Sequence, residues 1–377
     1  MKVVIALNTA WNAVNFREGL LRALVADGYD VVVAAPHDGY ASRIADFGCR
    51  YVPLPMDNKG SNPLRDVLLL CQFYRLLRNE QPDLFLGYTV KPNVYGSLAG
   101  HVMGVPVINN ISGLGAVFIK QNWLTLVVRL CYRLALYRSR KVFFQNRDDC
   151  NLFIDSGLVR SDVTAVLPGS GIDLKKFYLS PLVAQPHKFR FLLIARMLWD
   201  KGVGEFVEAA KIVQQRWPDF ECCLLGFLDV QNPAAISRAQ MNDWIAQGAV
   251  LYLGESDDVR SEIQKADCIV LPSFYREGVP HSLLEAASVG RPIITTDTAG
   301  CRDVVDEGKN GFLCKARDPK DLAEKMEQML LLSEEKRVAM SLYGRKKMER
   351  EFDEKIVLEQ YLEAIKAIIN KEMILVS

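Results

Sequence analysis

Two carboxylates, Glu277 and Glu285, lie on either side of a predicted helix start that follows the apolar run Cys268–Leu271. This run is short and contains β-branched residues, which is typical of a buried strand. Pro280 suits the first turn of a helix that Gly290 would end, so strand, loop and helix begin a βαβ unit. Because the ligand crevice of such a unit lies at the carboxyl end of its strands, we expect Glu277 in the crevice loop and Glu285 in the first helical turns.

Free backbone N–H groups at a helix start favour a phosphate, and a carboxylate beside that phosphate would repel it. The two glutamates are therefore better suited to accept hydrogen bonds from sugar or ribose hydroxyls. Spacing alone leaves a second interpretation open, in which Glu277 is a solvated loop charge and Glu285 complements the helix dipole.

A pair of cations follows another predicted strand. Phe189–Ile194 leads directly into Arg196 and Lys201, and a helical pattern begins after Gly202. The planar fork of an arginine and the point charge of a lysine together suit a diphosphate. Taken alone, the two cations could also be surface charges paired with Asp200.

Predicted strands alternate with helical patterns along the chain, which predicts two doubly wound parallel sheets. The first domain is expected to cover residues 1–180 and the second residues 187–353, with a connector at Ser180–His187. A long terminal helix is expected from Glu354 to Asn370. The predicted strands are Val3–Leu7, Val31–Ala35, Leu84–Gly87, Val105–Asn109, Val142–Gln145, Phe189–Ile194, Glu221–Leu225, Val250–Leu253, Cys268–Leu271 and Pro292–Thr296.

These motifs resemble, in their order, the retaining glycosyltransferases of family 4, over nearly the whole chain. That family has the GT-B fold, an α/β architecture of two Rossmann-like doubly wound domains that face a central cleft. In it a C-terminal helix, here within residues 354–377, crosses back to the first domain. The segment RMLWDKG matches the one that supplies an Arg and a Lys to the donor diphosphate, which implies that role for Arg196 and Lys201.

The segment EGVPHSLLE matches the family's pair of glutamates, which implies that Glu277 binds the donor sugar hydroxyls and Glu285 the ribose. The resemblance also places the backbone amides of Gly278 and Val279 near the sugar or the phosphate. It implies a metal-independent, retaining hexosyltransferase with no cofactor, in which Glu277, Arg196 and Lys201 are the catalytic residues. His281 is interpreted as a pocket-wall or helix-start residue.

Several segments resemble a narrower group, the bacterial transferases that extend polyprenyl-diphosphate-linked sugars. They are NFREGL, TVKPNVYGSLAG, NNISGLGAVF, LWDKGVGEF and AGCRD. The group includes the N-acetylgalactosaminyltransferases of bacterial N-glycan assembly, which act on undecaprenyl-diphosphate-linked diacetylbacillosamine, and capsule and O-antigen transferases share much of the pattern. The likeness implies a UDP-sugar donor, with N-acetylgalactosamine favoured, and a lipid-linked saccharide acceptor.

The chain departs from the family's pattern in the first loop, where the usual glycine pair is missing. Asn15 and Arg17 stand there instead, so side chains could supply the donor or acceptor contacts. The loop after Val105–Asn109 lacks the usual histidine. Ser112 or Asn110 could donate a hydrogen bond there, although neither is a convincing base.

Two further residues, Lys91 and Tyr95, could face the acceptor diphosphate and sugar, although Lys91 could equally be an exposed loop charge. Residues 122–141 interleave aliphatic and aromatic side chains with arginines. The helical pattern alone favours a buried helix with solvated arginines. The lipid-acceptor resemblance instead favours a peripheral place on the inner face of the plasma membrane, which such a helix could bind.

Composition describes a globular chain of 377 residues whose 46 basic and 45 acidic residues leave a net charge of +1. This balance gives no global attraction to nucleic acid. The nine scattered cysteines lack metal-ligand spacing, so free thiols in a reducing cytoplasm are expected and no metal site is implied. No stretch reaches the roughly 18 apolar residues of a membrane-spanning helix.

Two other function classes remain open from the sequence. A nucleotide-sugar epimerase can share the GT-B architecture, but it needs acid and base side chains at the sugar, and only four histidines are present. A catalytically silent donor-binding subunit would retain the donor residues without turnover. Incubation with the donor alone would separate both from a transferase.

Overall fold

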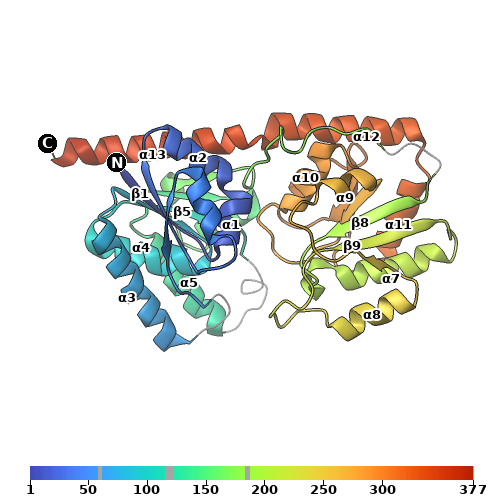
Figure 1. Ribbon diagram of the computed structural model, residues 1–377, viewed down its shortest axis with the longest axis horizontal. Coiled ribbons are helices and arrows are strands. Elements are labelled where there is room, and N and C mark those ends of the chain that lie inside the picture. The colour runs from blue at the N-terminus through green and yellow to red at the C-terminus, as the bar shows by residue number, and fades with distance from the viewer. Residues whose placement is uncertain (58–61, 115–122, 183–186, 377) are drawn as a thin grey trace. The chain divides into compact units, whose positions relative to one another are not determined.

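The chain forms two compact units, Gly171–Asp353 and the remainder, which consists of Met1–Ser170 and the residues from Glu354 onward. The computed structural model (Figure 1) describes residues 1–57, 62–114, 123–182 and 187–376, without the side chains of 123, 124 and 372–376. The predicted connector Ser180–His187, the segment NNISGLGAVF and the basic segment 122–141 therefore lie partly outside the described residues.

The division between the units falls before the boundary expected at residue 180. The Ile172 N–H donates to the Phe352 carbonyl at 2.9 Å, and Phe177 is buried in the core of the second unit. Burial of Phe177 against this core explains why the segment after Gly171 belongs with the second unit.

The first unit has, within the described residues, a seven-stranded sheet in the order β3-β2-β1-β4-β5-β6-β7, all pairs parallel. The chain leaves β1 towards one edge and returns to β4 beside it, which creates a topological switch point between these two strands. The strands are β1 Lys2–Ala6, β2 Asp30–Ala35, β3 Arg50–Pro53, β4 Leu84–Tyr88, β5 Val107–Ile111, β6 Lys141–Phe144 and β7 Thr164–Val166.

The second unit repeats this topology with six strands in its described part, in the order β10-β9-β8-β11-β12-β13. Its switch point lies between β8 and β11. The strands are β8 Phe189–Ile194, β9 Phe220–Leu225, β10 Leu251–Tyr252, β11 Cys268–Leu271, β12 Ile293–Thr296 and β13 Gly311–Cys314. Two doubly wound parallel sheets confirm the predicted α/β fold class.

Helices connect the parallel strands in both units (Figure 1). In the first unit the long helix α13 contacts α2, and its Val357 and Ile365 are buried in the same core as β1. The helices are α1 Ala10–Phe16, α2 Glu18–Ala26, α3 Pro63–Glu80, α4 Ser97–Met103, α5 Trp123–Leu136, α6 Arg147–Asp155, α7 Val203–Gln214, α8 Arg238–Ala246, α9 Arg260–Lys265, α10 His281–Val289, α11 Pro319–Leu330, α12 Glu334–Lys347 and α13 Glu354–Val376.

The strand predictions are confirmed in the sheet centres and incomplete at the sheet edges. Three short edge strands, β3, β7 and β13, were not predicted. The bounds expected for the strand Val105–Asn109 are wrong, since β5 begins and ends two residues later. The Val105 N–H donates to the Gly100 carbonyl at 2.9 Å and so completes the end of α4. As a result β5 extends through Asn110, which is buried in the sheet instead of lying in a loop.

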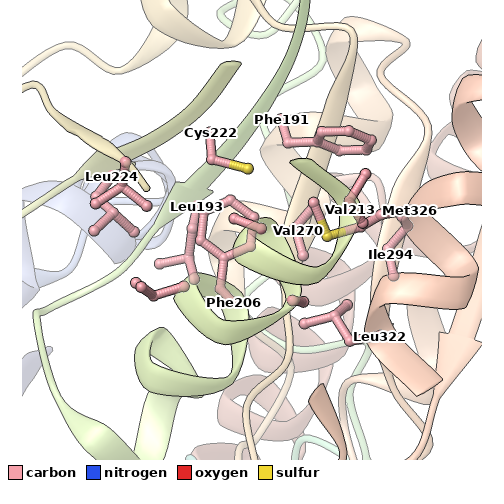
Figure 2. Close-up of a cluster of buried hydrophobic side chains, with 14 of the residues drawn as sticks. Phe191, Leu193, Phe206, Val213, Cys222, Leu224, Val270, Ile294, Leu322 and Met326 are labelled. Carbon is pink, nitrogen blue, oxygen red and sulfur yellow. The ribbon is translucent and has the colours of Figure 1, made fainter. Parts of the chain in front are cut away.

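A hydrophobic core holds β8 and β11 in place in the second unit. Figure 2 shows Leu193 of β8 and Val270 of β11 within a buried cluster that includes Phe206 of α7 and Met326 of α11. Full burial of such side chains contributes about 1.5–3 kcal/mol each. The core therefore fixes the strand ends from which the loops of the second switch point leave.

Candidate active site

The predicted donor residues lie on the segments that follow β8 and β11 at the switch point of the second unit, a region that we call the second-unit crevice. The loop after β8 carries Arg196 and Lys201, and the loop after β11 carries Glu277. Because β8 and β11 are neighbours in a parallel sheet, both loops leave from the same edge.

Backbone contacts hold the two loops together. The Asp200 carbonyl accepts hydrogen bonds from the N–H groups of Phe274 at 3.1 Å and Tyr275 at 3.0 Å. Gly202 has φ +76°, and a Cβ there would lie 2.1 Å from the Pro272 carbonyl oxygen. Only glycine fits this close approach and this left-handed backbone, so the loop carrying Lys201 sits directly on the end of β11.

Lys201 and Glu277 form an ion pair across the two loops, through Lys201 Nζ and Glu277 Oε1. Both side chains are mostly buried, with exposed fractions of 14% and 12%. Ser273 Oγ also donates to Glu277 Oε1 at 3.0 Å, and Lys201 Nζ lies 5.3 Å from the centroid of the Tyr275 ring. The structure thus brings together two residues that the sequence placed in separate motifs.

Glu285 projects from the predicted helix, which is confirmed as α10 with Pro280 as its N-cap and Gly290 as its left-handed C-cap. His281, the first residue of α10, is bonded through Nδ1 to Glu285 Oε1 at 2.8 Å. The helical i, i+4 spacing of the two residues could have revealed this contact. His281 therefore orients Glu285, a role that the sequence interpretation missed.

The backbone of Gly278 and Val279 is packed tightly against the next loop. A Cβ on Gly300, whose φ is +79°, would lie 1.8 Å from the Gly278 carbonyl oxygen. Val279 is 8% exposed, and its side chain belongs to a buried core cluster. The loop after β12 therefore fixes the position of the backbone whose amides are predicted to contact the donor.

Arg196 differs from Lys201, because it is exposed and forms no ion pair with any described residue. Its guanidinium is thus available to an anion. Cys301 lies beside the same crevice, and burial followed by the nearby Glu277 charge raises the pKa of its thiol to about 11. The thiol is therefore protonated at neutral pH.

The predicted acceptor-side residues lie in the first unit at the carboxyl ends of β1, β4 and β5, which we call the first-unit crevice. Arg17 follows α1, is 7% exposed, and stacks on the Tyr88 ring with 4.4 Å from Cζ to the ring centroid. Asn15 Nδ2 donates to the Trp11 carbonyl at 2.9 Å, and Ser112 Oγ donates to Asn110 Oδ1 at 2.6 Å.

Lys91 is not an exposed loop charge. Its Nζ lies 2.8 Å from Asp66 Oδ1, and both side chains are 17% exposed. Burial, and then the charge of the same Asp66, raise the pKa of the Tyr95 hydroxyl. Asp66, from the first turn of α3, thus gathers Lys91 and Tyr95 and was missed because its motif lies on a different helix.

The predicted membrane helix is α5, whose described side chains include exposed apolar residues at helical spacing. Leu130 and Leu134 are 58% and 56% exposed, and Tyr137, which directly follows the helix, is 70% exposed, whereas Tyr132 and Ala135 belong to a buried core cluster. The interpretation as a buried helix with solvated arginines is therefore wrong for this face, where apolar side chains are exposed as well. No helix in the described part of the chain is long and apolar enough to span a membrane. Among the same residues, no group of three or more His, Cys, Asp or Glu could hold a metal ion.

Comparisons with known proteins find matches to both units. Residues 177–347 match the family model described as Glycosyl transferases group 1, and residues 14–169 match the Glycosyl transferase 4-like domain. The chain is 29% identical to the N,N'-diacetylbacillosaminyl-diphospho-undecaprenol alpha-1,3-N-acetylgalactosaminyltransferase of Campylobacter jejuni, over 94% of this chain and 96% of that protein.

Two further matches extend the comparison. The UDP-Gal:alpha-D-GlcNAc-diphosphoundecaprenol alpha-1,3-galactosyltransferase of Escherichia coli is 24% identical, over 77% of each chain. The crystal structure of HepE of Anabaena in complex with UDP superposes with a TM-score of 0.77 at 17% identity, covering 97% of this chain and 100% of that one. The chain therefore belongs to the glycosyltransferases, as a hexosyltransferase of GT-B fold with a glycosyl transferase 4-like domain followed by a group 1 domain.

Proposed function

We propose that this glycosyltransferase moves N-acetylgalactosamine from its UDP conjugate to a polyprenyl-diphosphate-linked amino sugar, with retention of anomeric configuration and without a metal ion. The donor class and the lipid-linked acceptor are supported by the two transferases above, whose names specify diphospho-undecaprenol acceptors. The observation that carries the proposal is the Lys201–Glu277 pair at the second-unit crevice.

In the absence of the UDP-sugar, Lys201 and Glu277 are each other's partner. On binding, the diphosphate would take over Lys201 and recruit the exposed Arg196, while the released Glu277 would accept hydrogen bonds from the sugar hydroxyls. Glu285, held by His281, would accept from the ribose. The amides of Gly278 and Val279 would face the sugar or the phosphate. Exchange of one anionic partner for another limits the cost of desolvating Lys201.

In the transfer step, the bond between the anomeric carbon and the β-phosphate oxygen breaks and the acceptor hydroxyl oxygen bonds to the same face of that carbon. The hydroxyl proton passes to the departing phosphate, and UDP leaves. Arg196 and Lys201 would stabilise the charge that develops on the diphosphate, an electrostatic contribution of the kind that often dominates catalysis. On the acceptor side we assign Asn15, Arg17, Lys91, Tyr95 and Ser112 as contacts.

A mass-spectrometric transfer assay tests the proposal. Purified enzyme is incubated with UDP- and GDP-sugars and with polyprenyl-diphosphate-linked amino sugars. We expect a product heavier by one N-acetylhexosamine with the UDP donor, lost in Glu277→Ala and Lys201→Ala, and NMR of the product should show the donor's anomeric configuration. Intact donor binding without transfer to any of these acceptors would contradict it.

We also propose that α5 binds an anionic bilayer as a peripheral contact on the inner face of the plasma membrane, because its exposed apolar side chains neighbour the exposed Arg133 and Arg138. Co-sedimentation should show binding to vesicles containing phosphatidylglycerol and weaker binding to phosphatidylcholine. Leu130→Ser with Leu134→Ser should reduce the binding. Leu331→Ser, which changes a residue of the second unit that is 65% exposed, serves as the matched control.

A further inference from the structure

Arg17 is a buried cation that forms no ion pair with any residue the structure describes. The side chain is 7% exposed, its Nη1 donates to the Phe16 carbonyl at 3.0 Å, and its Nε has no hydrogen-bond partner among the described residues. A guanidinium has five N–H donors, so this side chain keeps most of its capacity unused. Burial of a charge in this state is costly unless an anion or further hydrogen bonds complete it.

The groups around Arg17 do not supply that anion. Its aromatic neighbour Tyr88 and the adjacent Tyr361 are both fully buried, and this burial raises the pKa of each hydroxyl, so both stay neutral. The carboxylate of Glu18, next in the chain, pairs with Arg22 at 2.9 Å. The stacking on Tyr88 offsets only part of the cost of burying this charge.

The two cations assigned to the acceptor side therefore differ in charge balance. Lys91 is neutralised by Asp66 at 2.8 Å, whereas Arg17 has no carboxylate within the part of the chain that the structure describes. An anionic ligand at the first-unit crevice gains more from Arg17 than from Lys91. A diphosphate also matches the planar fork of an arginine.

A series of side-chain contacts supports Arg17 through the Tyr88 ring on which it stacks. The rings of Tyr88 and Tyr361 are 6.3 Å apart, and Tyr361 Oη accepts a hydrogen bond of 2.7 Å from Asn110 Nδ2. Asn110 Oδ1 in turn accepts from Ser112 Oγ at 2.6 Å. The chain joins the carboxyl ends of β4 and β5 to α13, so it links two of the predicted acceptor-side residues, Arg17 and Ser112.

The adjacent backbone carries a second sign of a binding site. Thr89, directly after Tyr88, is a β-branched residue with φ +62°, and its Oγ1 is buried without a partner among the described residues. Asn12 Oδ1, from α1, is unpaired in the same sense. Strained backbone and unpaired buried polar atoms are both uncommon and occur together at ligand sites.

We infer that Arg17 binds the diphosphate of the lipid-linked acceptor, and that Tyr361 and Asn110 are positioning residues that hold Tyr88 and Arg17 in place for it. The inference rests on the proposed function, because the acceptor supplies the anion. It separates the acceptor-side residues by role, since Arg17 then recognises the diphosphate while Lys91 and Tyr95 are left to the saccharide.

The first test compares two acceptors that carry the same amino sugar, one on a polyprenyl diphosphate and one on an uncharged polyprenyl ether. Wild-type enzyme should prefer the diphosphate acceptor in kcat/KM. Arg17→Gln should reduce this preference by about 10- to 100-fold, the size expected for lost hydrogen bonds to a charged group, with an unchanged KM for the donor. Arg78→Gln removes an exposed arginine from the last turn of α3 and should leave the preference unchanged.

The second test reads the site without turnover. Isothermal titration of the enzyme, saturated with UDP so that the second-unit crevice is blocked, should show binding of farnesyl diphosphate and none of farnesol. Arg17→Gln should abolish that binding and Arg17→Lys should restore part of it. If wild-type enzyme binds farnesyl diphosphate through Arg17 yet transfers to no lipid-linked acceptor, the proposed function fails while the diphosphate site stands.

Tyr361→Phe removes one hydroxyl from the positioning chain. It should raise the KM for the diphosphate acceptor by about 3- to 10-fold, with kcat and the KM for the uncharged acceptor unchanged. Equal losses on both acceptors would assign Tyr361 a merely structural role. Retention of the diphosphate preference and of farnesyl diphosphate binding in Arg17→Gln would overturn the inference.

Discussion

The two crevices have the same topology and opposite charge arrangements. In the second unit, Lys201 is already paired with Glu277, and His281 is bonded to Glu285. In the first unit, Arg17 is stacked on Tyr88 and has no anionic partner among the described residues. In the second-unit crevice, a ligand would replace the internal partner of Lys201. In the first-unit crevice, a ligand would supply the anion that Arg17 lacks among the described residues.

The two crevices therefore differ in how far each is preorganised and in how much each gains on binding an anion. A paired crevice keeps its geometry without a ligand, but the ligand must compete with the internal ion pair. An unpaired, buried cation gains more from a matching anion and costs the free protein stability. Substitutions in the two crevices should therefore affect activity and stability differently.

The largest effect is expected at the Lys201–Glu277 pair. Lys201→Ala should lower kcat/KM by about 10²- to 10³-fold, because it removes stabilisation of the leaving diphosphate. Glu277→Gln should cause a comparable loss through the donor sugar, and steady-state kinetics checks both. Lys211→Ala, which removes an exposed pair with Glu208, should have no effect. A fall of less than threefold in Lys201→Ala would show that the pair is only structural.

A second large effect is expected from the glycine that supports the donor loop. Gly300→Ala places a Cβ against the Gly278 carbonyl and should lower kcat/KM about 100-fold by displacing this backbone. Gly308→Ala is the matched control, because Gly308 has φ +73° and no atom of the described residues lies within 4 Å of its Cβ position. It should share the backbone strain and keep normal donor binding. Equal kinetics in the two variants would contradict the proposed donor contact.

A smaller effect is expected where one side chain orients another. His281→Ala should raise the KM for the UDP-sugar about tenfold with little change in kcat, since Glu285 loses its hydrogen bond. His281→Asn, whose amide can donate in place of Nδ1, should recover part of the loss. A fall in kcat at constant KM would instead place His281 at the reacting atoms.

The smallest change concerns the strain in the first-unit crevice. Thr89→Gly should raise the free energy of unfolding by about 1 kcal/mol, because relief of the positive φ outweighs the entropy that glycine loses on folding. Thr164→Gly, at a position with φ −88°, should lower it by about 0.5–1 kcal/mol. Chemical denaturation measures both. A lower free energy of unfolding in Thr89→Gly would show that the backbone at Thr89 is not strained.

The second-unit crevice was the more predictable from sequence because each of its motifs lies on one strand–loop–helix segment. Arg196 and Lys201 follow β8 directly, and Glu277 and Glu285 are separated by one loop and one helical turn. Their meeting required only the neighbouring positions of β8 and β11. The ion pair between Lys201 and Glu277 could not be predicted, because it joins residues 76 positions apart through loop geometry.

The first-unit crevice was less predictable because its contacts are distant in sequence. Asn110 and Tyr361 are 251 positions apart, and no local pattern marks that hydrogen bond. Misplacing the strand at Val105–Asn109 also placed Asn110 in a loop. Edge strands such as β3 and β7 were missed because they are short and lack the continuous burial that marks central strands.

The position of Tyr361 on α13 has a consequence for synthesis of the chain. The core around β1 includes Val357, Tyr361 and Ile365, which the ribosome adds only after the whole of the second unit. The first unit therefore cannot complete its core until α13 has been synthesised, and until then part of its apolar surface is exposed. Nascent chains arrested before Glu354 should be held by chaperones, and the first-unit crevice should form after the second-unit crevice.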